Sequence, residues 1–181
     1  MNLPSTSPVA DPSGLWALQG YLLRQAESLL GSRDEQKIIY QPAWGANGPY
    51  IANGPDGAGA VLSPIAANSW RHVVFQLAHE TVHLLNPKEG YGTWLEEGIA
   101  VEFSMFAVDH FGLDPLQTGF QTYDHAREMV SLLPQGPFAA GSSIRENYGS
   151  FRSVSSDQLS ELFPDTDSAL LVQLCRECVP R

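Results

Sequence analysis

The stretch FQLAHETVHLLNP, residues Phe75 to Pro87, determines how the rest of the chain is interpreted. Apolar residues surround His79, Glu80 and His83, and Pro87 is expected to end a helix because the residue before a proline avoids the helical region. Residues four apart lie on one face of a helix, so the two imidazoles can converge on one point. Neutral imidazoles at this spacing suit Zn²⁺, and Glu80 can reach a water on that metal without binding the metal itself. The stretch predicts a helix that carries part of a zinc site.

The alternative interpretation is that His79 and His83 are ordinary core residues of an amphipathic helix. The apolar residues on both sides of the motif suit a helix that is buried on nearly all sides. Buried ionisable residues are uncommon unless they are paired or bound to a metal, which favours the interpretation as a site.

The segments around this helix predict an α+β fold with a small N-terminal sheet, two zinc-bearing helices and a helical C-terminal portion. A first helix is expected between Asp11 and Gly31, and the apolar segments KIIYQP, PYIAN and GAVLSP predict three short strands. Ser69 can cap the motif helix, which runs to about residue 86, and another helix is expected from Thr93 to near Gly112. Further helices are expected over residues 123–133, 143–154, 157–163 and 167–178, with PQGPFAAGSS (residues 134–143) as a flexible connection. Residues 1–181 are expected to form a single domain, of which residues 1–10 are flexible.

A catalytic zinc site needs a third protein ligand, and acidic residues downstream of His83 are candidates. Thr93 and Glu96 have the spacing of a capping box, which assigns the Glu96 side chain to the start of the next helix. Glu97 lies about 100° further around that helix and can project in a different direction. Glu89 is a rival, because it completes the pattern HExxHxxNxxE with an asparagine at the turn position. Ligands on helices are better positioned than ligands in loops, which favours Glu97.

The motif HETVH followed by WLEEGIAVEF resembles the gluzincin zinc metallopeptidases, in which the second motif reads approximately W-L-x-E-G-x-A. The resemblance covers residues 69–109 well and the flanking segments only loosely. It implies that His79, His83 and Glu97 bind the zinc and that Glu80 is the general base. It also implies that the strand before the motif helix, GAVLSP, forms the edge of the cleft, where an extended substrate would pair.

Two features depart from the family pattern. Only 13 residues lie between His83 and Glu97, which indicates a compact member with a short connection. Thermolysin-like enzymes have an aspartate four residues after the third ligand that orients a ligand histidine, but Val101 occupies this position here. Glu102 is the candidate for that supporting role.

Peptide hydrolysis also needs a hydrogen-bond donor that stabilises the oxyanion of the tetrahedral intermediate. Gluzincins supply a tyrosine or histidine from their C-terminal helical half, and Tyr148 in RENYGSFRSV is similar to the pattern in compact members. Tyr123 and His125, in TYDHAREM, are alternatives. A buried tyrosine with a satisfied hydroxyl is also commonplace, so a structural role for Tyr148 stays open.

Composition limits the class of partner. The formal charge of −10 argues against nucleic acid and anionic lipid, which bind to clustered lysine and arginine. No apolar run approaches the roughly 18 to 20 residues that span a bilayer, and the N-terminal residues lack the pattern of a signal peptide, so the chain is expected to be cytoplasmic. Cys175 and Cys178 are too few for a disulfide framework and are interpreted as ordinary thiols.

Together these features predict a zinc-dependent metallopeptidase that acts on a peptide or protein substrate, with Glu80 as general base and Tyr148 as oxyanion donor. One alternative is a zinc-binding domain that has lost peptidase activity and acts as an interaction or regulatory module. A hydrolase of non-peptide amides and a protein without a metal are further alternatives. The sequence indicates no particular oligomeric state.

Overall fold

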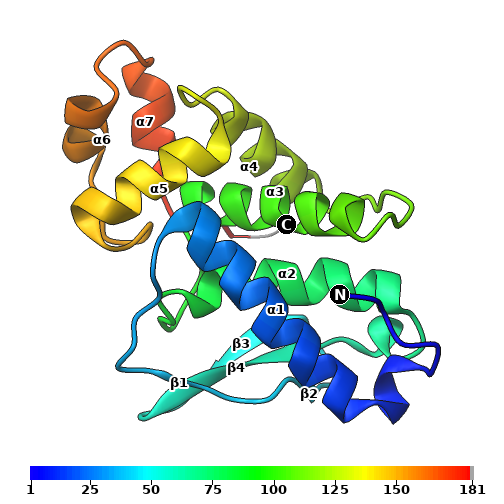
Figure 1. Cartoon of the computed structure of the whole chain (residues 1–181). Coiled ribbons are helices and arrows are strands. Elements are labelled where there is room, and N and C mark those ends of the chain that lie inside the picture. Colours follow the sequence, from blue (N-terminus) through cyan, green and yellow to red (C-terminus); the bar gives the residue numbers. More distant parts are fainter. Residues whose placement is uncertain (180–181) are drawn as a thin grey trace. The chain divides into compact units, whose positions relative to one another are not determined.

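The computed structural model describes residues 1–179, so the predicted domain span of 1–181 ends with two residues outside the described part (Figure 1). Its class is α+β, as predicted. Contacts divide the chain into two compact units. The first unit comprises Met1–Glu27, Ser32–Glu89 and Phe103–Leu116, and the second comprises Ser28–Gly31, Gly90–Glu102 and the residues from Gln117 onward. Two helices, α1 (Pro12–Leu30) and α3 (Trp94–His110), contribute residues to both units.

The sheet of the first unit is built around β4 (Gly57–Leu62), whose six residues are all buried. Two short strands, β1 (Ile38–Ile39) and β2 (Ala43–Trp44), pair in parallel with one edge of β4, and β3 (Tyr50–Asn53) pairs in antiparallel fashion with the opposite edge. Ala58 demonstrates this arrangement, because it pairs with a residue of β1 and with a residue of β3. The sheet is therefore mixed, with β4 at its centre.

The central place of β4 corrects one prediction. The segment GAVLSP was expected to form the edge of a cleft, and this is wrong because β4 has a partner strand along both edges. Among the described residues, β1, β2 and β3 each pair with β4 alone, so the outer edges of these three strands have no partner strand, and α2 packs against β3. The segments KIIYQP and PYIAN contain the expected strands β1 and β3, whereas β2 was not predicted.

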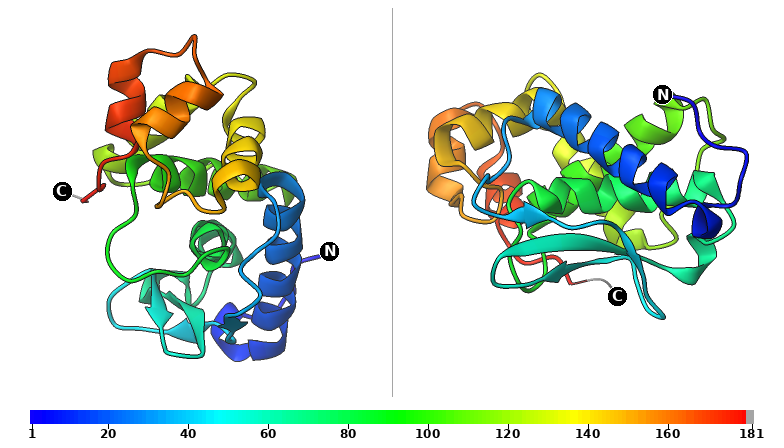
Figure 2. Two further views of the ribbon diagram at one scale, coloured as in Figure 1. Left: turned by 90° about the vertical axis from the view of Figure 1, so that its left-hand side faces the viewer. Right: turned by 60° about the horizontal axis from the view of Figure 1, so that its bottom comes forward.

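The helices of the first unit begin at their predicted capping residues. At the start of α1, Asp11 Oδ1 accepts a hydrogen bond from the Gly14 amide at 2.8 Å. Ser69 Oγ accepts a hydrogen bond from the His72 amide at 3.4 Å, where α2 (Trp70–Leu84) begins. This helix packs against β4 and β3, as the two views of Figure 2 show. The sheet thus provides the surface on which the motif helix rests.

A buried hydrogen bond joins α1 to α2. Gln19 Nε2 donates to Thr81 Oγ1 at 3.0 Å, and the Thr81 hydroxyl donates to the Leu77 carbonyl oxygen at 2.6 Å. Gln19 and Thr81 are both fully buried. Buried polar groups need such partners, so this bond fixes the register of α2 against α1.

The second unit is helical and contains the first turns of α3 with the helices that follow it (Figure 1). The helices that follow are α4 (Gln121–Ser131), α5 (Pro137–Tyr148), α6 (Ser156–Leu162) and α7 (Ser168–Leu174). Among them, α7 packs against both α6 and α4. None of the helices in the described part of the chain has both the length and the apolar content needed to cross a membrane.

The position of α5 differs from its prediction. The expected flexible connection over residues 134–143 is wrong from Pro137 onward, because α5 begins at Pro137 and ends at Tyr148. Proline is well tolerated in the first helical turn, where its missing N–H is not needed. Close packing accounts for the glycine in this segment. A Cβ atom added at Gly141 would lie 2.9 Å from the Leu30 side chain and 3.5 Å from the Phe151 side chain. Close packing against these residues holds the segment as a helix.

Candidate metal centre

The two histidines of the motif lie one turn apart on α2 and are both buried. His79 is 6% exposed and His83 is 7% exposed. Their ring centroids are 5.0 Å apart, and the rings are inclined at 65° to each other. Glu80 follows His79 directly and is 3% exposed, although it projects about 100° away around the helix. The helix therefore holds three ionisable side chains in a largely apolar environment.

The first turn of α3 carries the third residue of the candidate centre. Thr93 Oγ1 accepts a hydrogen bond from the Glu96 amide at 3.3 Å, which is the Thr93 half of the predicted capping box. The Thr93 carbonyl accepts from the Glu97 amide at 3.0 Å, so Glu97 belongs to the same turn. Glu97 is 7% exposed. Acidic residues are favoured in the first turn of a helix because the helix dipole is positive there.

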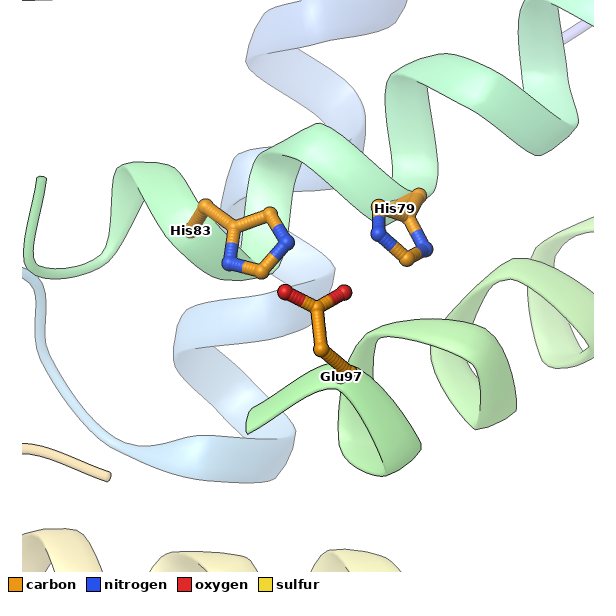
Figure 3. Close-up of side chains that lie close together, drawn as sticks. All are labelled: His79, His83 and Glu97. Atoms are coloured by element: carbon orange, nitrogen blue, oxygen red, sulfur yellow. The ribbon is translucent and has the colours of Figure 1, made fainter. Parts of the chain in front are cut away.

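His79, His83 and Glu97 form a group of three potential metal ligands, and Figure 3 shows their side chains directed toward one another. One ligand atom from each residue lies within 4.8 Å of the other two. Within residues 1–179 this is the only group of at least three His, Cys, Asp or Glu side chains with such a spacing. The structure thus brings together the three ligands predicted from the sequence.

The size and chemistry of this group fit a zinc ion. For three atoms this close together, a central point lies at most about 2.8 Å from each, whereas zinc binds nitrogen and oxygen at about 2.0 to 2.2 Å. Two imidazoles and one carboxylate form a ligand set that catalytic zinc uses, with a fourth position left for water or substrate.

The alternative ligand and the predicted supporting residue lie elsewhere. Glu89 is exposed and is not a member of the group of three. Glu102 was the candidate to orient a ligand histidine, but its carboxylate accepts a hydrogen bond from Arg127 Nε at 2.6 Å. The prediction for Glu102 is therefore wrong, because the carboxylate pairs with α4 at a partly exposed position.

None of the three candidates for the oxyanion donor belongs to the group of ligands. The Tyr148 hydroxyl donates to the Gln158 carbonyl oxygen at 3.2 Å, which gives this tyrosine a structural role. The Tyr123 ring lies edge-on to Phe120, with 5.6 Å between the ring centroids. The His125 ring has a similar edge-on contact with Trp94, also at 5.6 Å. The role of Tyr148 in catalysis stays a prediction.

Arg152 is a residue near the candidate centre that sequence reasoning missed. Its Nε donates to the Glu96 carboxylate, and its Nη1 donates to the Gly90 carbonyl oxygen at 3.1 Å. The side chains of Arg152 and Glu96 are only 13% and 4% exposed. This ion pair holds Glu96, the residue directly before Glu97, in the part of α3 that belongs to the second unit. The sequence carries no signal for it, because 56 positions separate the two partners.

The two cysteines are free thiols, as predicted. Cys178 is fully buried, and this burial together with the nearby charge of Glu97 raises the pKa of its thiol to about 12. Burial also raises the pKa of the Cys175 thiol. Both groups are neutral at physiological pH and therefore poor nucleophiles.

Comparisons with known proteins found no protein family model, no curated protein and no solved structure that matches this chain. The arrangement of His79, His83 and Glu97 in α2 and α3 is consequently the observation from which a function can be argued.

Proposed function

We propose that this protein is a zinc-dependent metallopeptidase. The observation that carries the proposal is the buried group of His79, His83 and Glu97, which has the ligand types and spacing of a catalytic zinc site. Two imidazoles and one carboxylate gathered at a buried position form a donor set of the kind that binds a divalent cation. The two sequence motifs, HETVH and WLEEGIA, place these ligands as in the gluzincins that the chain resembles.

The proposed mechanism assigns one task to each side chain. His79, His83 and Glu97 would hold Zn²⁺, which when bound polarises a carbonyl group and lowers the pKa of a water molecule. Glu80 accepts the proton of the attacking water and passes it to the leaving amine. Glu80 suits this task because it directly follows the proposed ligand His79 on α2, which is the position of the general base in an HExxH motif. Tyr148 would exchange its hydrogen bond to Gln158 for one to the oxyanion.

An extended peptide is the substrate class that the first unit favours. The outer edge of β3 (Tyr50–Asn53) has no partner strand in the described part of the chain, so its backbone groups are open to pairing. A peptide added to such an edge gains main-chain hydrogen bonds that do not depend on its sequence. The same helix that carries His79 and His83 packs against β3. We therefore assign β3, rather than β4, as the strand that would align a peptide substrate.

The zinc content of the purified protein tests the metal assignment. Wild type is expected to contain about one zinc per chain by elemental analysis, and Glu97→Ala and His83→Ala are expected to lose it. Glu89→Ala is the matched control, because Glu89 is an exposed glutamate outside the group of ligands, and it should keep the metal. Wild type without zinc after reconstitution would refute the proposed function.

The activity assay separates the peptidase from the inactive zinc-binding module. Glu80→Gln is expected to keep its zinc and to cleave a library of quenched fluorescent peptides at least about 100-fold more slowly than wild type. A Glu80→Gln variant that cleaves as fast as wild type would contradict the assignment of the general base. Full zinc occupancy without cleavage by wild type would favour the regulatory module instead.

A further inference from the structure

Residues 92–94, which lead into α3, pair with residues 176–178, which follow α7. The Trp94 amide donates to the Arg176 carbonyl oxygen at 2.9 Å, and the Cys178 amide donates to the Gly92 carbonyl oxygen at 2.8 Å. Between these two bonds, Thr93 and Glu177 form an antiparallel bridge. All of these residues belong to the second unit, together with Glu97. We call these two paired segments the carboxylate support.

Gly92 places the backbone of the carboxylate support directly against the Glu97 side chain. A Cβ atom added to Gly92 would overlap Glu97 Oε1 and lie 3.1 Å from Glu96 Oε2. Only glycine permits such a close approach of backbone to carboxylate. The atom in the way is the end of a flexible side chain, so a larger residue at position 92 would displace the Glu97 carboxylate rather than the backbone. The position of this ligand therefore depends on Gly92.

The carboxylate support is itself well fixed. Cys178 is fully buried, and the segment that carries it makes both backbone hydrogen bonds to residues 92–94 with good geometry. Gly92 does not have a positive φ, so alanine is compatible with its backbone conformation. The three nearest atoms that an alanine Cβ would meet at this position all belong to the carboxylates of Glu96 and Glu97.

We propose that Gly92 and the segment Arg176–Cys178 position the Glu97 carboxylate for metal binding. This inference rests on the proposed function, because it gives a positioning role to residues around a proposed metal ligand. Neither Gly92 nor Cys178 touches the metal; both act through Glu97. Residues that orient a metal ligand typically contribute about 10-fold to 100-fold in metal affinity, and we expect a loss of this size when the support is disturbed.

Metal titration of Gly92→Ala tests the proposal without any activity assay. The affinity for Zn²⁺ is measured by competition with a chromophoric chelator, and the visible absorption of bound Co²⁺ reports the geometry of its ligands. Gly92→Ala is expected to bind zinc about 10-fold to 100-fold more weakly than wild type and to change the Co²⁺ spectrum, with an unchanged melting temperature of the metal-free protein. Gly20→Ala is the control, since its Cβ would make only an ordinary contact, 3.5 Å from Arg24 Nη1.

A second variant tests the segment that follows α7. Cys178→Pro removes the N–H that donates to Gly92 and is also expected to weaken zinc binding at least about 10-fold. Ser168→Pro is its matched control, because Ser168 is the first residue of α7, where a missing N–H is harmless. This pair of variants keeps the proposal testable if Gly92→Ala does not fold.

The outcomes separate this inference from the proposed function. Weakened binding in Gly92→Ala or Cys178→Pro, with the controls like wild type, would support the positioning role. Wild-type affinity and an unchanged Co²⁺ spectrum in the folded variants would overturn it and leave the metal site intact. Wild type that binds neither Zn²⁺ nor Co²⁺ would overturn the proposed function and this inference with it.

Discussion

Replacing Arg152 by alanine is expected to destabilise the protein far more than the loss of an ordinary surface charge. The Arg152 guanidinium pairs with the Glu96 carboxylate and also donates to the Gly90 carbonyl oxygen at 3.1 Å. The two side chains are only 13% and 4% exposed, so water cannot replace the guanidinium efficiently. Removing one partner of a buried pair typically costs about 3 to 5 kcal/mol, because the other charge stays buried without compensation.

The size of this effect is large relative to the total stability. A domain of ordinary stability unfolds with about 5 to 15 kcal/mol, so Arg152→Ala should lose roughly a fifth or more of this free energy. For a chain of this length, each kcal/mol corresponds to about 2 to 4 °C in melting temperature, which predicts a decrease of roughly 6 to 20 °C. Urea unfolding followed by circular dichroism and tryptophan fluorescence measures the change in free energy, and calorimetry measures the change in melting temperature.

The chain contains a matched control for this experiment. Arg127 forms a similar ion pair with Glu102 at 2.6 Å, but the two side chains are 44% and 24% exposed. An exposed pair contributes about 0 to 1 kcal/mol, so Arg127→Ala should be nearly neutral. If Arg152→Ala and Arg127→Ala differ by less than about 1 kcal/mol in unfolding free energy, burial does not determine the strength of these pairs and the reasoning is refuted.

Three further predictions follow from the packing, the caps and the thiols. Gly98→Ala should lower the unfolding free energy by about 1 to 3 kcal/mol in urea titrations, because its Cβ would overlap the Ala126 carbonyl oxygen of α4; unchanged stability would contradict this close approach. Ser69→Ala should lose about 1 kcal/mol by removing the hydrogen bond from the His72 amide, and Ser69→Gly should lose only a few tenths in the same assay. The pKa of about 12 for Cys178 means that the native thiol keeps its proton above pH 9 while the unfolded thiol loses it. The unfolded state then binds fewer protons than the native state, so the unfolding free energy should fall by up to about 1.4 kcal/mol per pH unit above pH 9. Urea titrations between pH 8 and pH 11 measure this slope, which should be smaller in Cys178→Ala.

The helices that carry the candidate centre could be predicted from the sequence because their ends have local signals. Asp11 and Ser69 are capping residues whose side chains accept the expected amide hydrogen bonds. The motif helix keeps the i, i+4 spacing of His79 and His83, which fixes their common face before any tertiary contact is known. Glu97 was identified because the capping box assigned its neighbour Glu96 to a different task. Local chemistry was sufficient for these residues.

The structural features that were predicted wrongly or missed have one property in common. Each of them depends on contacts between segments that are distant in the sequence. The two residues of β2 are too few to show a period, and their strand exists because β4 offers an edge to pair with. The six apolar residues of β4 indicate a buried strand but do not say that both of its edges are occupied. The start of α5 was missed because Pro137 and the small residues after it resemble a linker until their neighbours are known. The partner of Glu96 was equally inaccessible, since Arg152 is 56 positions away.

The pairing of residues 92–94 with residues 176–178 also sets an order of events during protein synthesis. More than about 80 residues separate the two segments, so at about 5 to 20 residues per second the second segment is made roughly 4 to 16 s after the first. Throughout this interval the nascent chain already contains His79, His83 and Glu97, but Gly92 has no partner segment to hold it. Under the proposed positioning role, the metal site reaches its full zinc affinity only after residues 176–178 have been synthesised and have paired with residues 92–94.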